Sequence, residues 1–167
     1  MSAVQARTLA DERAVWGALA EVPDPEIPAV SVVDLGIVHR VDVEPDAIRV
    51  EILPTFVGCP AVEMMRSAIA DRLAGLAPRI DVDVTFAVPW TSDRITSEGR
   101  RRLAASGFAP PLPAGDPAAP ISLTRAVACP YCGSRRTVME NAFGPTLCRS
   151  IYYCTECRQP FEQFKSV

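Results

Sequence analysis

The stretch TFVGCP at residues 55–60 marks the junction around which the fold of this chain is organised. Before it, AIRVEIL at residues 47–53 alternates apolar and polar side chains, which is typical of a half-buried strand. After it, apolar residues recur at helical spacing, and Pro60 suits the first helical position because it needs no amide partner there. We therefore expect a strand, a loop that carries Cys59, and then an amphipathic helix.

Cys59 is expected at or beside the N-cap of that helix. Unpaired backbone N–H groups and the positive end of the helix dipole would then stabilise a thiolate and lower the pKa of the thiol. A thiol of that kind is a nucleophile or a metal ligand. The alternative is a small buried residue that packs against the sheet, as free cysteines often do. The local pattern leaves both interpretations open.

Hydrophobic periodicity on either side of this junction predicts the rest of the first domain. The expected elements are a helix capped by Thr8 that runs to about Glu21, a hairpin of strands 37–43 and 47–53, a helix that ends near Gly75, a strand over 80–88, and a short helix from about Ser97 to Gly107. The stiff loop PDPEIP at residues 23–28 carries Asp24 and Glu26. The fold class is α/β (α+β), with a small mixed sheet and helices on one of its faces.

Composition limits the protein class. The chain has 167 residues, of which 49% are hydrophobic, so one domain and a small module can bury a core. It has no apolar run of membrane-spanning length and no signal-peptide pattern at its start, which predicts a soluble, cytoplasmic protein that does not bind membranes. A net charge of −3 argues against a nucleic-acid partner and favours a protein partner or a small ligand. In such a compartment the six cysteines are expected as thiols or metal ligands.

A proline-rich segment divides the chain. Residues 110–120, PPLPAGDPAAP, contain five prolines and little that can be buried, so they are predicted to form a semi-rigid linker. The expected organisation is an α/β domain over residues 1–109, the linker over 110–120 and a small module over 121–167.

Two Cys-x-x-Cys pairs are the strongest chemical signal. CPYC at residues 129–132 and CTEC at residues 154–157 are separated by 21 residues, and two such pairs supply the four thiolates of a closed tetrahedral site. We predict a structural Zn²⁺ that contributes much of the folding free energy of this small module; iron or a redox dithiol is the alternative. The predicted ligands are Cys129, Cys132, Cys154 and Cys157. Cys148 is in phase with neither pair and is expected as a buried thiol, with a second metal or redox role as the alternative.

Other motifs argue against an independent active site. The sequence contains no Ser-His-Asp arrangement, phosphate-binding glycine loop or dinucleotide fingerprint, so no catalytic residue is predicted. Three arginines at residues 100–102 form a small basic cluster, whose expected role is a solvated helix face rather than an anion or partner site. Asp24, Glu26 and Asp34 can form an acidic rim, although caps and turns explain such residues more often.

The order of several short motifs resembles a known family. DPEIP at residues 24–28, VDLG at 33–36 and TFVGCP at 55–60 are similar to the signature of the small α/β domain of iron–sulfur and metal–sulfur cluster assembly factors. FGPTLC at residues 143–148 and YCTECRQPFEQFK at 153–165 resemble the tail of the accessory-subunit family of the bacterial phenylacetyl-CoA epoxidase, a multicomponent di-iron monooxygenase. The resemblance spans nearly the whole chain.

This resemblance implies an accessory or maturation factor for aerobic phenylacetate breakdown, which assists iron–sulfur cluster or metal-centre assembly. It assigns cluster handling to Cys59 and the acidic loop to Asp24 and Glu26, with iron or an iron–sulfur cluster as a transient cargo. It also implies protein partners among the epoxidase subunits or the reductase, with a homo-oligomer as a further possibility. One alternative is an adaptor that docks the oxygenase components without handling metal. Another is a thiol oxidoreductase that uses Cys59 and Cys148.

Overall fold

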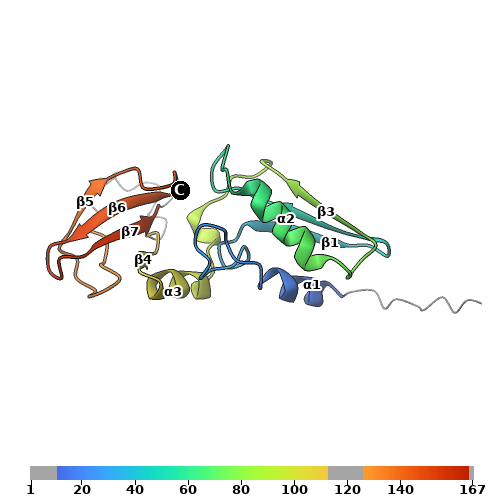
Figure 1. Cartoon of the computed structure of the whole chain (residues 1–167), viewed down its shortest axis with the longest axis horizontal. Coiled ribbons are helices and arrows are strands. Elements are labelled where there is room, and N and C mark those ends of the chain that lie inside the picture. Colours follow the sequence, from blue (N-terminus) through green and yellow to red (C-terminus); the bar gives the residue numbers. More distant parts are fainter. Residues whose placement is uncertain (1–10, 113–125, 166–167) are drawn as a thin grey trace, which may run out of the picture.

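The computed structural model describes residues 11–112 and 126–165, and within them the chain forms two sheets. The first sheet has three strands and the second has four. In Figure 1 the first sheet and two helices form one body, the second sheet forms another, and a third helix lies between them. No helix in the described part of the chain is long and apolar enough to cross a membrane.

The first helix begins one turn later than predicted. Helix α1 spans Glu12–Leu19, and the Asp11 side chain caps it by accepting a hydrogen bond from the backbone N–H of Ala14. Thr8, the predicted cap, lies outside the described residues. The apolar face of α1 buries Val15 and Leu19 completely, so the helix is anchored by packing as well as by its cap.

The hairpin and crossover agree with the sequence pattern. Strand β1 (Val38–Val43) pairs antiparallel with β2 (Ala47–Ile52), and helix α2 (Val62–Leu73) then returns the chain so that β3 (Arg79–Val84) pairs parallel with β2. Residues Ile48, Val50 and Ile52 of the central strand are fully buried. Both α1 and α2 pack with this sheet (Figure 1), which confirms the mixed sheet with helices.

Strand β3 is shorter than the predicted 80–88. It ends at Val84, and Phe86 and Val88 are 60% and 39% exposed although they continue the alternating pattern. The reason is that β2 ends at Ile52, so the pairing of Ile52 with Val84 is the last in the parallel register. The alternating pattern therefore overestimated the length of β3, because β2 offers no pairing partner beyond Ile52.

The second sheet includes a strand from before the proline-rich segment. Strand β4 (Phe108–Ala109) pairs parallel with β7 (Pro160–Phe164), while β6 (Arg149–Cys154) pairs antiparallel with both β7 and β5 (Thr137–Asn141). Most of the predicted linker lies outside the described residues, and its semi-rigid character stays a prediction. The pairing of β4 with β7 shows that residues on either side of that segment belong to one sheet. We call β5, β6, β7 and their loops the ribbon.

The motif VDLG holds the segment that leads to the ribbon. Three successive backbone carbonyls accept from that segment: Asp34 O from Thr96 N–H at 2.9 Å, Leu35 O from Trp90 Nε1 at 2.9 Å, and Gly36 O from Arg94 Nε at 3.0 Å. This segment contains the short 3-10 helix η1 (Ser92–Arg94) and helix α3 (Ser97–Ala105). The contacts explain why α3 packs beside β4 and not on the first sheet.

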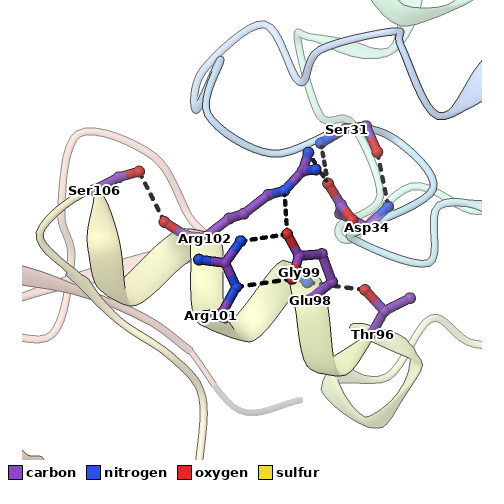
Figure 2. Close-up of polar contacts among 8 residues, drawn as sticks. All are labelled: Ser31, Asp34, Thr96, Glu98, Gly99, Arg101, Arg102 and Ser106. Atoms are coloured by element: carbon purple, nitrogen blue, oxygen red, sulfur yellow. Dashed lines mark hydrogen bonds and ion pairs between the residues drawn. The ribbon is translucent and has the colours of Figure 1, made fainter.

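Side-chain ion pairs reinforce this attachment (Figure 2). Arg102 of α3 reaches Asp34 at 3.1 Å, and the Asp34 carboxylate also accepts from the backbone N–H of Ser31. Arg101 and Arg102 both donate to Glu98, which lowers the pKa of that carboxyl to about 2. Arg101 and Arg102 lie on an exposed helix face, as expected for the cluster. Arg100 differs, because it is largely buried and donates to the backbone carbonyls of Pro111 at 2.6 Å and Ser92 at 2.7 Å.

The ribbon packs directly on the α/β domain. Phe164 of β7 and Cys148, the residue before β6, are buried in the main core cluster rather than in the separate small core of the ribbon. The rings of Phe164 and Trp90 lie 5.8 Å apart. The two modules therefore share a core, and residues of both meet at the junction.

Candidate metal and thiol sites

Two turns of similar conformation carry the paired cysteines. In the first, Gly133 N–H donates to Cys129 O at 2.8 Å, and in the second, Arg158 N–H donates to Cys154 O at 2.9 Å. Both donors have positive φ, +73° for Gly133 and +59° for Arg158, and Arg158 is the only non-glycine residue with positive φ in the described chain. These turns direct both sulfurs of each pair to one side.

The four sulfurs form a compact cluster. The Sγ atoms of Cys129, Cys132, Cys154 and Cys157 all lie within 4.8 Å of one another. The Cys129–Cys157 and Cys132–Cys154 Sγ distances are 3.7 and 3.6 Å. A tetrahedral zinc with Zn–S bonds of about 2.3 Å separates its sulfurs by about 3.8 Å. The donor set and its dimensions therefore fit one four-coordinate metal ion, as the spacing predicted.

Cys59 lies in the loop between β2 and α2, two residues before the N-cap, which is Ala61. The cap was predicted at or beside Cys59, with Pro60 as the first helical residue, but the helix begins at Val62, so Cys59 lies two residues before the cap. The backbone N–H groups of Ala61 and Val62 still interact with the sulfur and lower the pKa of the thiol. Burial nevertheless raises the pKa of Cys59 above its usual value, and the negative charges of Glu26 and Asp24 raise it further. The predicted depressed pKa is wrong for this structure.

The acidic loop does lie beside Cys59. Asp24 is buried and accepts from the backbone N–H groups of Glu26 at 3.1 Å and Ile27 at 2.8 Å, so its carboxylate holds the loop in shape. Burial is the largest influence on Asp24 and raises its pKa, although each of these two hydrogen bonds lowers it. Glu26 is half-buried, and its carboxylate lies 3.8 Å from the guanidinium of Arg149 in the ribbon. Asp34 joins neither residue, because it is paired with Ser31 and Arg102 elsewhere.

A cavity lies between the two modules beside Cys59, and we call it the junction cavity. Its volume is about 230 Å³. One wall consists of Glu26, Thr55, Phe56, Cys59 and Pro60 of the α/β domain, and the other of residues 144–148 of the ribbon. A smaller adjoining pocket is lined by Asp24, Glu26, Cys59 and Cys148 among others. The structure thus brings together the three predicted residues of the first domain.

Cys148 belongs to the same place, and sequence reasoning joined it with Cys59 only in the thiol oxidoreductase alternative. Its side chain is buried, it lines both pockets with Cys59, and it is a free thiol like Cys59. The only sequence signal was a cysteine that no Cys-x-x-Cys pair explains. No local pattern connects it with Cys59, since the two residues belong to different modules.

Comparisons with known proteins agree with this two-part structure. Residues 12–86 match the family described as "Iron-sulfur cluster assembly protein", and residues 114–165 match the "PaaD zinc beta ribbon domain". A solved structure of a domain of unknown function, DUF59, from Bacillus anthracis has a TM-score of 0.51 with 27% identity, over 55% of this chain and 90% of that one.

Two curated relatives place the chain more narrowly. It is 36% identical over 155 residues, 92% of each protein, to a subunit of the "Putative 1,2-phenylacetyl-CoA epoxidase" of Escherichia coli (strain K12). It is 33% identical over 86 residues, 49% of this chain and 82% of the relative, to "Fe-S protein maturation auxiliary factor YitW" of Bacillus subtilis (strain 168). The fold and the matches define a protein that joins an iron–sulfur cluster assembly domain to a zinc ribbon. The chain belongs to the PaaD family, the family of the epoxidase relative.

Proposed function

We propose that this chain is a non-catalytic accessory protein of a phenylacetyl-CoA epoxidase system, and that it assists the assembly of an iron–sulfur cluster or another metal centre in that system. The observation that carries this proposal is the similarity to the epoxidase relative over 92% of both chains. Similarity of the first domain to an iron–sulfur maturation factor supports the assembly role.

Cys59 is the residue of the first domain that contacts the cargo in this proposal. It lines the junction cavity, and two backbone N–H groups interact with its sulfur. A neutral thiol that becomes a thiolate when a metal ion arrives suits transient binding, because the proton must be displaced and can return on release. Glu26 and Asp24 add negative charge that attracts a cation.

The four-cysteine cluster has a different role in this proposal. It binds Zn²⁺ through Cys129, Cys132, Cys154 and Cys157 with no open position, and the ion stabilises the ribbon. The small separate core of the ribbon, six buried residues of which two are cysteines, supports a structural role for the metal. The ribbon then supplies one wall of the junction cavity.

A protein partner receives the cargo. Val57, Phe143 and Leu147 are large apolar residues that are more than half exposed, and they come from the two loops that supply the walls of the cavity. Exposed apolar side chains grouped in this way favour contact with another protein. A component of the epoxidase or its reductase is the expected partner.

A second candidate function is an adaptor that docks the oxygenase components without handling metal. The observation that favours it is the raised pKa of Cys59, which leaves the thiol protonated at neutral pH. The exposed apolar side chains serve an adaptor equally well.

The test is to produce the epoxidase components with this protein, without it, and with its Cys59→Ser variant, and then to measure iron, labile sulfide and epoxidase activity. The assembly proposal expects low iron loading without the protein and with Cys59→Ser, while the control variant Ala105→Ser, exposed on α3 and outside the cavity, supports normal loading. Full loading with Cys59→Ser would leave only the adaptor function. Full loading without the protein would exclude an assembly role altogether.

A further inference from the structure

The junction cavity contains a thiol from each module. Cys59 comes from the loop after β2 and Cys148 from the residue before β6, and both line the main cavity and the smaller pocket beside it. Glu26 lines both pockets too. Burial is the main cause that raises the pKa of both thiols, and the negative charge of Glu26 raises both further, so one carboxylate acts on the two sulfurs.

The ribbon holds Cys148 in place through its neighbours. The Cys148 carbonyl accepts from the backbone N–H of Lys165 at 2.9 Å, and its sulfur shares a hydrogen bond with Thr146 Oγ1 at 3.1 Å. The adjacent Arg149 donates to Thr146 Oγ1 and to Glu162, each at 2.9 Å. The position of this thiol is therefore set by the β6–β7 hairpin and not by a free loop.

We infer that Cys148 is the second thiol of the Cys59 site, so that the two modules together bind a thiophilic metal cargo, Fe²⁺ or an iron–sulfur cluster, between one sulfur from each. The inference rests on the proposed assembly role and names the ligands of that site. Two soft thiolate ligands suit iron and other thiophilic ions and disfavour Mg²⁺ or Ca²⁺.

Two protein thiolates leave part of the coordination sphere of the ion or cluster to other ligands. A four-cysteine site is closed and retains its metal, whereas a site with two thiols keeps positions for a ligand from the receiving protein. The main cavity is also open to an approaching chain at residues such as Leu147, which is 56% exposed. This arrangement suits a cargo that is passed on.

The binding test uses the full-length, zinc-loaded protein and Co²⁺ as a probe, because thiolate ligation of cobalt produces a charge-transfer absorption. The wild-type protein should bind one Co²⁺ in addition to its zinc and show this absorption. Cys59→Ser and Cys148→Ser should each weaken binding by at least ~10-fold, the lower end of what even an outer-shell partner contributes to metal affinity. Ala105→Ser, an exposed change on α3 outside the cavity, should bind like the wild type. Wild-type binding by Cys148→Ser, or no thiolate absorption in the wild type, would overturn the inference.

A second measurement needs no variant, which matters because Cys148 is buried in the main core. Phenylarsine oxide condenses with two neighbouring thiols, forming two As–S bonds and releasing one water, with no change of oxidation state. In the zinc-loaded wild type, peptide mass mapping should find Cys59 and Cys148 joined by one arsenic. Separate single adducts, or none, would show that the two sulfurs cannot share an ion.

The two experiments separate this inference from the proposed function. Iron loading of the epoxidase that needs Cys59 but not Cys148 would leave the assembly role standing and refute the two-thiol site. Cobalt binding that needs both thiols, combined with full loading of the epoxidase in the absence of this protein, would keep the site and refute the assembly role.

Discussion

Replacement of Phe164 by alanine tests whether the ribbon and the α/β domain form one folding unit. Phe164 is only 2% exposed, it belongs to the main core cluster, and its ring lies 5.8 Å from that of Trp90. Trp90 in turn donates to Leu35 O at 2.9 Å, so the phenylalanine is packed against the residue that ties the connecting segment to the first domain.

The expected cost follows from burial. Truncation of a fully buried phenylalanine removes its transfer free energy and leaves a cavity, which lowers the free energy of unfolding by about 3–5 kcal/mol. Phe161 is the matched control, because it is also almost fully buried but belongs to the separate core of the ribbon, stacked on Tyr152 at 5.6 Å. Both substitutions delete the same atoms and differ only in which core they damage.

Urea unfolding of zinc-loaded protein, followed by tryptophan fluorescence in a Trp16→Phe background, reports on Trp90 alone. Phe164→Ala should shift the Trp90 transition to lower urea by the amount above and move the emission of the folded protein to longer wavelength, since Trp90 gains exposure to water. Phe161→Ala should leave the folded emission unchanged. A Phe164→Ala protein within about 0.5 kcal/mol of the wild type, the range of surface substitutions, would refute the shared core.

Three further predictions concern the attachment of α3 and the ribbon. Gly99→Ala should lower the free energy of unfolding by about 1–3 kcal/mol, because the added Cβ would lie 2.5 Å from Asp34 O. This overpacking outweighs the better helix propensity of alanine. Equal or higher stability of the variant in urea would contradict the close packing of Gly99 on Asp34. Glu98 should titrate with a pKa of about 2 by NMR, and Arg101→Gln should raise that pKa. Because the pKa is depressed in the folded protein, the small stability that the carboxylate contributes is lost only as the pH falls from about 4.5 through 2. A pKa near 4.5 in the wild type would contradict the ion pairs with Arg101 and Arg102. Cys132→Ser should abolish stoichiometric zinc in elemental analysis and unfold the ribbon, whereas a folded ribbon without zinc would refute the structural metal.

Local patterns predicted most of the first domain. The hairpin and the helix after Cys59 follow from periodicity within short windows, and the parallel pairing of β3 follows because one helix fills the connection. The cysteine cluster was equally predictable, since two residues between paired cysteines bring both sulfurs to one ion. These features depend on neighbours along the chain.

Features that depend on contacts between distant segments were missed or wrong. The backbone amides after Cys59 lower the pKa of its thiol, as the helix-terminus argument expected. Burial raises the pKa by more than this, and burial depends on the packing of distant segments, which the local sequence does not reveal. VDLG looked like a possible source of an acidic ligand at Asp34, yet the structure uses its carbonyls to hold residues 90–96. Cys148 reaches the cavity only because the ribbon folds back on the first domain.

Strand β6 connects the two sulfur sites of this protein. Its last residue, Cys154, belongs to the four-cysteine cluster, and Cys148 immediately precedes its first residue, Arg149. At about 3.3 Å per residue, the six-residue offset places the two residues about 20 Å apart along the strand, so one metal ion cannot bind to both sites. A metal at the cluster would fix one end of β6. The register of β6 with β7, from Arg149 opposite Phe164 to Tyr153 opposite Pro160, places Cys148 at the other end. In the proposed function, the ribbon carries a thiol to Cys59, and a metal ion at the four-cysteine cluster would stabilise the ribbon in that position.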